Sequence, residues 1–279
     1  MPASFLIIGP AIPESPVLLS VPHAGRDYPD ALCAALRAPV ASLRTLEDRH
    51  VDAIALAARE RETLLLQTLP RAWIDLNRAE HERDPVIDSG ARGGPLSAKV
   101  RAGLGIVPRR TSTSGDLWRR RLDGVEVEAR IAADHRPYHM ALAELIARAR
   151  QRFGIAILLD VHSMPPIAGS RARVVIGDRF GRAAAARLVH RIEAEVEGYD
   201  IRCALNTPYA GGHILERHAR PHANVHAIQL EIDRSLYLDR QLDQPGPGMP
   251  LVTQLLRRVI DALTDEAMRD SIPPAQAAE

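Results

Sequence analysis

The chain has 279 residues and a formal net charge of +1, from 36 lysines and arginines against 35 acidic residues. This balance excludes nucleic-acid binding through bulk positive charge. With 46% hydrophobic and 25% charged residues, the composition is typical of a globular chain and excludes overall disorder. No run reaches the roughly 18 apolar residues of a membrane span, and the N-terminus lacks a basic signal-peptide region, so we expect a cytoplasmic protein without membrane contact.

The first half of the chain alternates between strand-like and helix-like segments. We expect strands at 17–21, 63–69 and 72–76, a helix that begins near Asp48, and helices on both sides of Pro137 within 119–151. Segment 83–117 is dense in Gly, Pro, Ser, Thr and Arg and shows no periodicity. Long loops of this kind in compact domains are often functional.

The second half continues this alternation. Residues 155–161 form the clearest strand, because a continuous apolar run suits a central strand covered on both faces. Further segments predict strands at 173–176, 201–205 and 225–232, and helices at 180–196 and from Pro250 onward. The pattern predicts one α/β domain over residues 1–270, built on a largely parallel or mixed sheet, with a flexible tail at 271–279.

Two histidines and an aspartate lie where metal ligands are expected. His23 follows the strand at 17–21, His162 lies at the end of the central strand, and Asp48 lies at the start of a helix. Sites in open α/β sheets gather at the carboxyl ends of strands. Two imidazoles and one carboxylate, with a fourth position for water, are a usual catalytic zinc shell. The alternatives are surface histidines, Asp48 as a helix N-cap, and Glu47 as the carboxylate ligand.

A further carboxylate is needed beside such an ion, to take a proton from water and deliver it to a leaving amine. Glu231, at the end of the strand at 225–232, is the candidate for this catalytic role. Asp160 lies two residues before His162, on the same face of the strand, and can orient an imidazole. Both carboxylates have the alternative of being turn or cap residues.

Other polar residues are candidates for binding the substrate. Arg78 can clamp a carboxylate with two hydrogen bonds, and Asn77 supplies a neutral amide beside it. Arg136, flanked by His135 and Pro137, is a candidate catalytic oxyanion donor, although a lone arginine is also an ordinary surface residue. The paired glycines Gly211 and Gly212 allow a close backbone approach to a substrate.

Seven short segments occur in an informative order along most of the chain. They are SVPHAG at 20–25, EDRHVD at 47–52, WIDLNR at 73–78, RPYH at 136–139, DVHS at 160–163, NTPYAGGHI at 206–214 and HAIQLEIDRSLY at 226–237. Each segment is short, but together and in this order they resemble the N-formylglutamate amidohydrolase family.

The resemblance implies a three-layer α/β/α fold with a central mixed, largely parallel sheet, similar to zinc carboxypeptidases and aspartoacylases. It also implies one divalent ion, usually Zn²⁺, and cleavage of an N-formyl amide, with N-formyl-L-glutamate as the expected substrate and histidine degradation as the usual pathway. By position, His23, Asp48 and His162 match the metal-binding places, with Asp48 preferred over Glu47. Glu231 matches the general base and acid, and Asn77 with Arg78 matches the pair that holds a substrate carboxylate.

The chain also departs from the family's pattern. Arg49 takes a place often held by an aromatic residue, a proline usually found soon after DLNR is absent, and segment 83–117 is this chain's own. These departures leave the acyl group and amino-acid side chain of the small-molecule substrate open, as is the oligomeric state.

Three alternative functions remain on the sequence alone. The first is a deacylase for a different N-acyl amino acid, and the second is a non-catalytic carboxylate-binding protein on the same scaffold. The third is a ureohydrolase with two manganese ions, because DVHS superficially resembles a DxHxD metal motif. Met164 stands after Ser163, where that motif has a carboxylate.

Overall fold

The computed structural model describes residues 4–111 and 113–269 of the chain. The expected flexible tail at 271–279 lies outside these residues. Within the described ranges, no helix combines the length and the apolar character that crossing a membrane requires.

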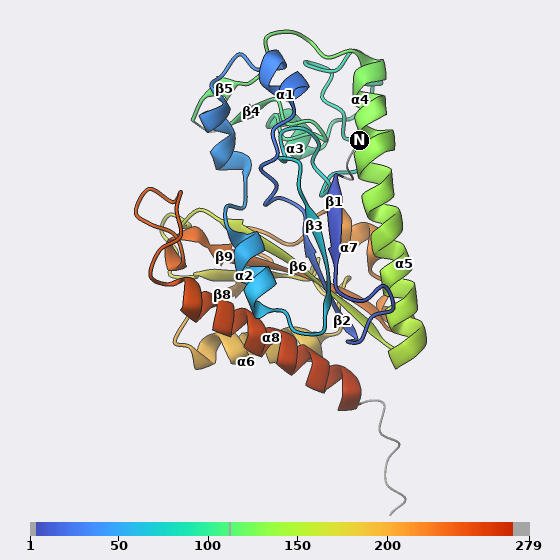
Figure 1. Ribbon diagram of the computed structural model, residues 1–279, viewed down its shortest axis with the longest axis vertical. Coiled ribbons are helices and arrows are strands. Elements are labelled where there is room, and N and C mark those ends of the chain that lie inside the picture. The colour runs from blue at the N-terminus through green and yellow to red at the C-terminus, as the bar shows by residue number, and fades with distance from the viewer. Residues whose placement is uncertain (1–3, 112, 270–279) are drawn as a thin grey trace, which may run out of the picture.

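A seven-stranded sheet runs through the middle of the fold (Figure 1). Its strands are β1 (Phe5–Ile8), β2 (Val17–Val21), β3 (Thr63–Gln67), β6 (Ala156–Met164), β7 (Val174–Gly177), β8 (Cys203–Leu205) and β9 (Val225–Asp233). They lie in the order β1-β3-β2-β6-β9-β7-β8. Strands β3, β2, β6 and β9 are parallel, whereas β1 and β7 run antiparallel to β3 and β9. The predicted mixed, largely parallel sheet is confirmed.

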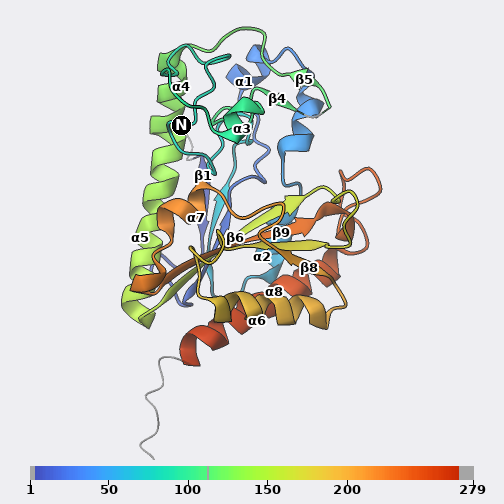
Figure 2. The same cartoon turned by 180° about the vertical axis from the view of Figure 1, so that it is seen from behind.

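Helices cover both faces of this sheet. The α-helices are α1 (Asp30–Ala35), α2 (Val51–Ala58), α3 (Ala98–Arg101), α4 (Gly124–Arg130), α5 (Arg136–Phe153), α6 (Ala186–Gly198), α7 (His213–His218) and α8 (Met249–Arg269). Helices α2, α6 and α8 pack on one face and share one apolar core with it. Helices α5 and α7 pack on the opposite face in a second core, as Figures 1 and 2 show from two sides. The predicted three-layer α/β/α arrangement is confirmed.

Strand β6 shows how the sheet places polar groups at one point. Its residues alternate between the two faces. Ile157, Leu159 and Val161 enter the core beneath α2, α6 and α8, whereas Leu158 enters the core beneath α5. Asp160 and His162 therefore point to the α5 side, beyond the last apolar residue of that face. The apolar sequence of β6 fixes the strand in the sheet, and its carboxyl end delivers the two polar side chains.

The strand expected at 72–76 is wrong, because this stretch folds as successive turns. The backbone N–H of Trp73 donates to the carbonyl of Pro70 at 2.8 Å, and that of Asp75 donates to the carbonyl of Ile106 at 2.7 Å. Neither bond is made with a strand of the sheet. The apolar residues Ile74 and Leu76 are still fully buried, so burial rather than pairing explains the apolar pattern.

Two further elements differ from the prediction. Helix α6 begins at Ala186 rather than near Phe180, because Arg179 and Phe180 have φ values of 56° and 57° in the left-handed region. Strand β1 was not expected at all. Segment 83–117 is largely irregular as predicted, apart from α3 and the short strands β4 (Arg110–Thr111) and β5 (Gly115–Asp116), at the top of Figure 1.

Shorter helical turns connect these elements. They are η1 (Val40–Leu46), the π-helical turn η2 (Ile131–His135), η3 (Pro221–Ala223) and η4 (Arg234–Leu236). Turn η2 runs directly into α5, where Pro137 occupies the first turn. Because proline has no N–H, it interrupts the hydrogen-bond ladder at the point where η2 passes into α5.

Candidate metal centre

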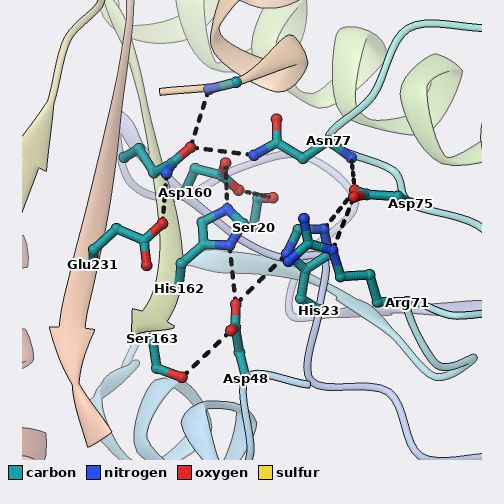
Figure 3. A network of polar contacts seen from close by, with 12 residues as sticks. Ser20, His23, Asp48, Arg71, Asp75, Asn77, Asp160, His162, Ser163 and Glu231 are labelled. Carbon is teal, nitrogen blue, oxygen red and sulfur yellow. Dashed lines mark hydrogen bonds and ion pairs between the residues drawn. The ribbon is translucent and has the colours of Figure 1, made fainter. Parts of the chain in front are cut away.

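The three predicted metal ligands lie together at the carboxyl end of the sheet (Figure 3). One ring nitrogen from each of His23 and His162 and a carboxylate oxygen of Asp48 lie within 4.8 Å of one another. Asp48 Oδ2 is 3.0 Å from His162 Nδ1 and 3.6 Å from His23 Nδ1. All three side chains are buried. Residues separated by more than a hundred positions in the sequence therefore converge on one small volume.

The outer nitrogen of each imidazole is held by a second carboxylate. His23 Nε2 lies 2.7 Å from Asp75 Oδ1, and His162 Nε2 lies 2.9 Å from Asp160 Oδ2. A carboxylate accepts, so each Nε2–H donates outward and each Nδ1 faces Asp48. Metal-binding histidines commonly have this arrangement. The donor set thus fits one divalent ion held by two imidazole nitrogens and one carboxylate.

Asp48, rather than Glu47, faces the imidazoles. Glu47 accepts hydrogen bonds from the Tyr28 hydroxyl and, at 2.9 Å, from Arg49 Nη1. Asp48 is also not the N-cap of α2, because that position is taken by His50. The choice between these adjacent carboxylates, left open by the residue pattern, thus follows from where each side chain finds its partners.

The second oxygen of Asp48 is anchored as well. Asp48 Oδ1 accepts from Arg234 Nη2 at 3.1 Å and from Ser163 Oγ at 3.4 Å, and Arg234 Nε donates to Ser163 Oγ at 3.0 Å. Neither Arg234 nor Ser163 was assigned a role from the sequence. Both follow a candidate strand end directly, which is the signal that could have singled them out.

Burial and charge act in opposite directions on this group. Burial alone would raise the pKa of Asp48, but hydrogen bonds from His162 and His23 hold that pKa well below its usual range. Burial alone would lower the pKa of His162, but the charge and hydrogen bond of Asp160 and the hydrogen bond to Asp48 raise it well above its usual range. Both shifts favour a protonated His162 between two ionised carboxylates when no metal ion is bound.

Glu231 lies beside this group on the neighbouring strand. It is the register partner of His162 in the parallel pair β6–β9, so both side chains project from the same face of the sheet. Gln229 Nε2 donates to Glu231 Oε1 at 2.8 Å. Burial is the main cause that raises the pKa of Glu231 to about 7, with the charge of Asp48 acting in the same direction. A carboxyl group with this pKa can both accept and return a proton near neutral pH.

An arginine that sequence reasoning missed points into the site. Arg71 Nε lies 2.8 Å from Asp75 Oδ2, and Figure 3 places its guanidinium beside His23. Burial would lower the pKa of Arg71, but the charges of Asp75 and Asp48 raise it. Arg71 stands between a proline and an alanine in a chain rich in arginine, so its sequence context carries no signal.

Arg78 is buried close to the same carboxylate. Its Nε donates to the carbonyl of Leu104 at 2.9 Å, its Nη1 donates to the carbonyl of Asn77 at 2.7 Å, and its Nε lies 3.9 Å from Asp75 Oδ2. Burial is the main cause that lowers the pKa of this guanidinium. Asp75 thus faces two guanidiniums, and a guanidinium is suited to bind an anionic ligand such as a carboxylate.

Asn77 links the turn at 75–78 to the loop before α7. Its Nδ2 donates to Gln229 Oε1 at 3.2 Å, and its Oδ1 accepts from the Ile214 N–H at 2.9 Å. A Cβ on Gly212 would lie 2.4 Å from Asn77 Oδ1. Gly211 has φ of 100°, in the left-handed region. The two glycines therefore allow this loop to approach Asn77. Their close approach to a substrate stays a prediction.

Arg136 is the predicted site residue that the structure does not bring to this group. Its guanidinium donates to Glu80 Oε2 at 2.7 Å and to Glu128 Oε1 at 2.8 Å. Its side chain is 43% exposed. A guanidinium occupied by two surface carboxylates is a poor oxyanion donor, so Arg71 is the better candidate for that role.

A mixed α/β fold here gathers two imidazoles, an aspartate and a buried glutamate at its strand ends, an arrangement that could hold a divalent ion beside a carboxyl group. The model of the family "N-formylglutamate amidohydrolase" matches residues 15–238. The chain therefore belongs to the N-formylglutamate amidohydrolase family, which confirms the resemblance seen in the sequence.

Individual relatives agree with this assignment. The N-formylglutamate deformylase of Pseudomonas putida is 28% identical over 262 residues, covering 88% of this chain and 92% of that protein. The N-formylglutamate deformylase of Pseudomonas aeruginosa is 30% identical over 237 residues, covering 81% and 83%. The crystal structure of N-formylglutamate amidohydrolase from Ralstonia eutropha JMP134 superposes with a TM-score of 0.85 at 31% identity, covering 97% of this chain and 100% of that one.

Proposed function

We propose that the protein is a zinc-dependent amidohydrolase that converts N-formyl-L-glutamate and water to formate and L-glutamate. The observation that carries this proposal is the convergence of His23, Asp48 and His162 beside the buried Glu231. Each imidazole is oriented by a hydrogen bond from its Nε2–H to a second carboxylate. The names of the relatives support the substrate. Family membership also weighs against the ureohydrolase alternative.

The residues that would hold the ion are His23 and His162, through Nδ1, and Asp48, through its carboxylate. When bound, zinc supplies Lewis acidity, because it lowers the pKa of a bound water to about 7 and polarises a carbonyl. Asp75 and Asp160 keep the two imidazoles oriented through their Nε2–H groups. Ser20 Oγ donates to Asp160 Oδ1 at 2.6 Å and fixes that carboxylate in turn.

Arg78 and Asn77 would hold the substrate's carboxylate. Arg78 is a buried guanidinium whose nearest carboxylate, Asp75, is already paired with Arg71, so Arg78 can bind an incoming carboxylate. Asn77 Nδ2 has two hydrogens and donates one to Gln229 Oε1, so the other can be donated to the substrate. Gly211 and Gly212 contribute by letting the loop reach Asn77.

Arg71 would stabilise the negative charge that develops on the formyl oxygen, because its partly buried guanidinium lies beside His23 and faces the centre. Positioned donors aimed at developing charge are among the largest contributions to catalysis. This role replaces the one expected of Arg136.

Glu231 would move the proton. It takes a proton from the attacking water and gives it to the nitrogen of the breaking C–N bond, which leaves as the amine of glutamate while the formyl carbon leaves as formate. A pKa near 7 suits both halves of this transfer, because the group must bind the proton and release it in each cycle.

A substrate panel tests the proposal. We expect a higher kcat/KM for N-formyl-L-glutamate than for N-acetyl-L-glutamate or N-formyl-L-leucine, measured by release of the free amino acid. A preference for the acetyl compound would identify a deacylase of another N-acyl amino acid. If zinc-loaded protein binds these compounds but hydrolyses none of them, the non-catalytic alternative is favoured. A cytoplasmic location and a place in histidine degradation stay predictions.

A further inference from the structure

A second group of histidines lies against the turn at 76–78. His135 ends the π-helical turn η2, His139 lies one turn further along α5, and His213 is the first residue of α7. One ring nitrogen from each lies within 4.8 Å of the others. Ring centroids are 4.4 Å apart for His135 and His139, and 5.3 Å apart for His139 and His213.

Two of these rings are oriented by the backbone. His135 Nε2 lies 2.8 Å from the carbonyl of Arg78, and His139 Nε2 lies 3.0 Å from the carbonyl of Leu76. A carbonyl only accepts, so each Nε2–H donates and each Nδ1 carries the lone pair. Outward donation to a carbonyl or carboxylate is the usual setting of a metal-binding imidazole. His23 and His162 are oriented in the same way, by carboxylates in place of carbonyls.

Ring nitrogens in this group of histidines lack hydrogen-bond partners. His135 is fully buried, yet its Nδ1 has no hydrogen-bond partner within the described residues, and neither ring nitrogen of the half-buried His213 has one. Buried polar atoms are paired in the large majority of cases. Glu80 Oε1 comes to 4.0 Å of His135 Nδ1, beyond hydrogen-bond distance. A competitor for the third ring is His218, whose Nε2 lies 2.9 Å from His139 Nδ1.

We propose that His135, His139 and His213 form a second metal site, for a divalent transition-metal ion such as zinc. A ligand set of neutral imidazoles favours zinc, copper, nickel or cobalt over magnesium and calcium, which prefer oxygen. Binding needs the His218 N–H to leave His139 Nδ1, so that three lone pairs face the ion. Water or Glu80 can complete the shell.

The position of this site gives the ion a structural task. It would join the start of α5 to the start of α7, while the same two imidazoles hold the carbonyls on either side of Asn77. Occupancy would therefore stiffen the turn that presents Asn77 and Arg78. We expect loss of this ion to raise KM more than it lowers kcat, and to lower the thermal midpoint of unfolding.

Stoichiometry tests the proposal in the full-length chain. Metal-free protein is titrated with Zn²⁺ or Co²⁺, and bound metal is measured by elemental analysis, with cobalt absorption as a second readout. We expect two ions per chain for the wild type, one for His162→Gln, one for His213→Tyr and none for the double variant. Removal of one ligand should weaken the affected binding step by more than the about 10- to 100-fold that loss of a ligand's own hydrogen-bond partner costs.

His218→Gln is the matched control. It lies on the same short helix as His213 and removes the ring that competes for His139 Nδ1, so it should still take two ions. One ion in the wild type, or an unchanged second binding step in folded His213→Tyr, would overturn the proposal. If His213→Tyr does not fold, the metal content of folded His162→Gln decides. A His162→Gln chain that binds no ion would contradict a second site.

Discussion

At the scale of single residues, the proton on His162 has a measurable consequence. The pKa of His162 is raised well above its usual value because two buried carboxylates flank the ring, so the metal-free centre carries this proton at neutral pH. A metal ion needs the lone pair that the proton occupies. Zinc binding should therefore release about one proton from this centre near pH 7.

Calorimetric titration of zinc into the His213→Tyr variant, which keeps only the first centre, measures this release. The observed heat should differ between two buffers of equal pH and different ionisation enthalpy, in proportion to the protons released. Because a raised pKa keeps the ring protonated at low pH, zinc affinity should fall as the pH decreases. A buffer-independent heat would contradict the assignment of a protonated His162.

Glu231 is the residue whose loss should affect chemistry alone. Glu231→Gln keeps the shape and the hydrogen bond to Gln229 but cannot accept a proton. We expect kcat to fall by about 10² to 10⁴-fold and the metal content to stay unchanged. Glu216→Gln, an exposed carboxylate on α7, is the control and should behave as the wild type. Full turnover in Glu231→Gln would remove this residue from the mechanism.

Arg71 and Arg136 allow a direct comparison of two guanidiniums. We expect Arg71→Ala to lower kcat by about 10² to 10³-fold, because a positioned donor to developing charge is lost. Arg136→Ala removes partly exposed ion pairs with Glu80 and Glu128, which typically contribute little, so its kcat should stay within about threefold of the wild type. The reverse ranking, from steady-state kinetics, would restore the original assignment of Arg136.

At the scale of elements, the loop before α7 depends on one glycine. A Cβ at Gly212 would lie 2.4 Å from Asn77 Oδ1, whereas a Cβ at Gly198, at the end of α6, would meet nothing within 4 Å. Gly212→Ala should displace Asn77 and lower kcat/KM by about 10 to 100-fold. Gly198→Ala should change the free energy of unfolding by about 1 kcal/mol at most. Equal kinetics in the two variants would contradict the coupling of this loop to Asn77.

Elements whose neighbours are all apolar were predictable from the sequence. Strands β2, β6 and β9 are buried along their whole length because helices cover both faces, and the polar residues at their ends indicated His23, His162 and Glu231. The stretch at 72–76 also has an apolar sequence, but the turn that it opens differs from a strand in the groups that donate hydrogen bonds to its backbone carbonyls. Two of them accept from His135 and His139 of another element instead of a neighbouring strand. Such long-range partners leave no periodicity in the sequence.

The roles of Asp75 and Arg71 were not predictable for a related reason. Asp75 binds His23, which lies 52 positions away in the sequence, and Arg71 belongs to the centre only because Asp75, four residues later, does. Arg136 lies away from the centre because, within the motif HRPYH, His135 and His139 face the core while the arginine between them faces outward. A helix turns its residues by about 100° at each step, so neighbours in a motif face different directions.

At the scale of the whole molecule, buried histidines make stability sensitive to acid. Burial is the main cause that lowers the pKa of His218 to about 3, and burial also lowers the pKa of the fully buried His139. The unfolded chain binds these protons below about pH 6.5, whereas the folded chain does not. Their contribution to stability is therefore complete above that pH and is lost as the pH falls.

Denaturant titrations of the metal-free chain between pH 7.5 and 4 measure this loss. Each such histidine should contribute a slope of up to about 1.4 kcal/mol per pH unit below pH 6.5. His218→Phe removes one titrating ring of similar size, and the free energy of unfolding of this variant should depend less steeply on pH. An identical slope in the two proteins would show that His218 titrates normally in the folded chain.

The central claim is that a single buried centre hydrolyses N-formyl-L-glutamate with the help of zinc. The most direct test measures formate released from this substrate by purified protein, first after complete chelation and again after zinc is restored. The proposed function predicts no release from the chelated protein and full release once zinc returns. Undiminished release without metal, or no release from protein with zinc bound, would contradict it.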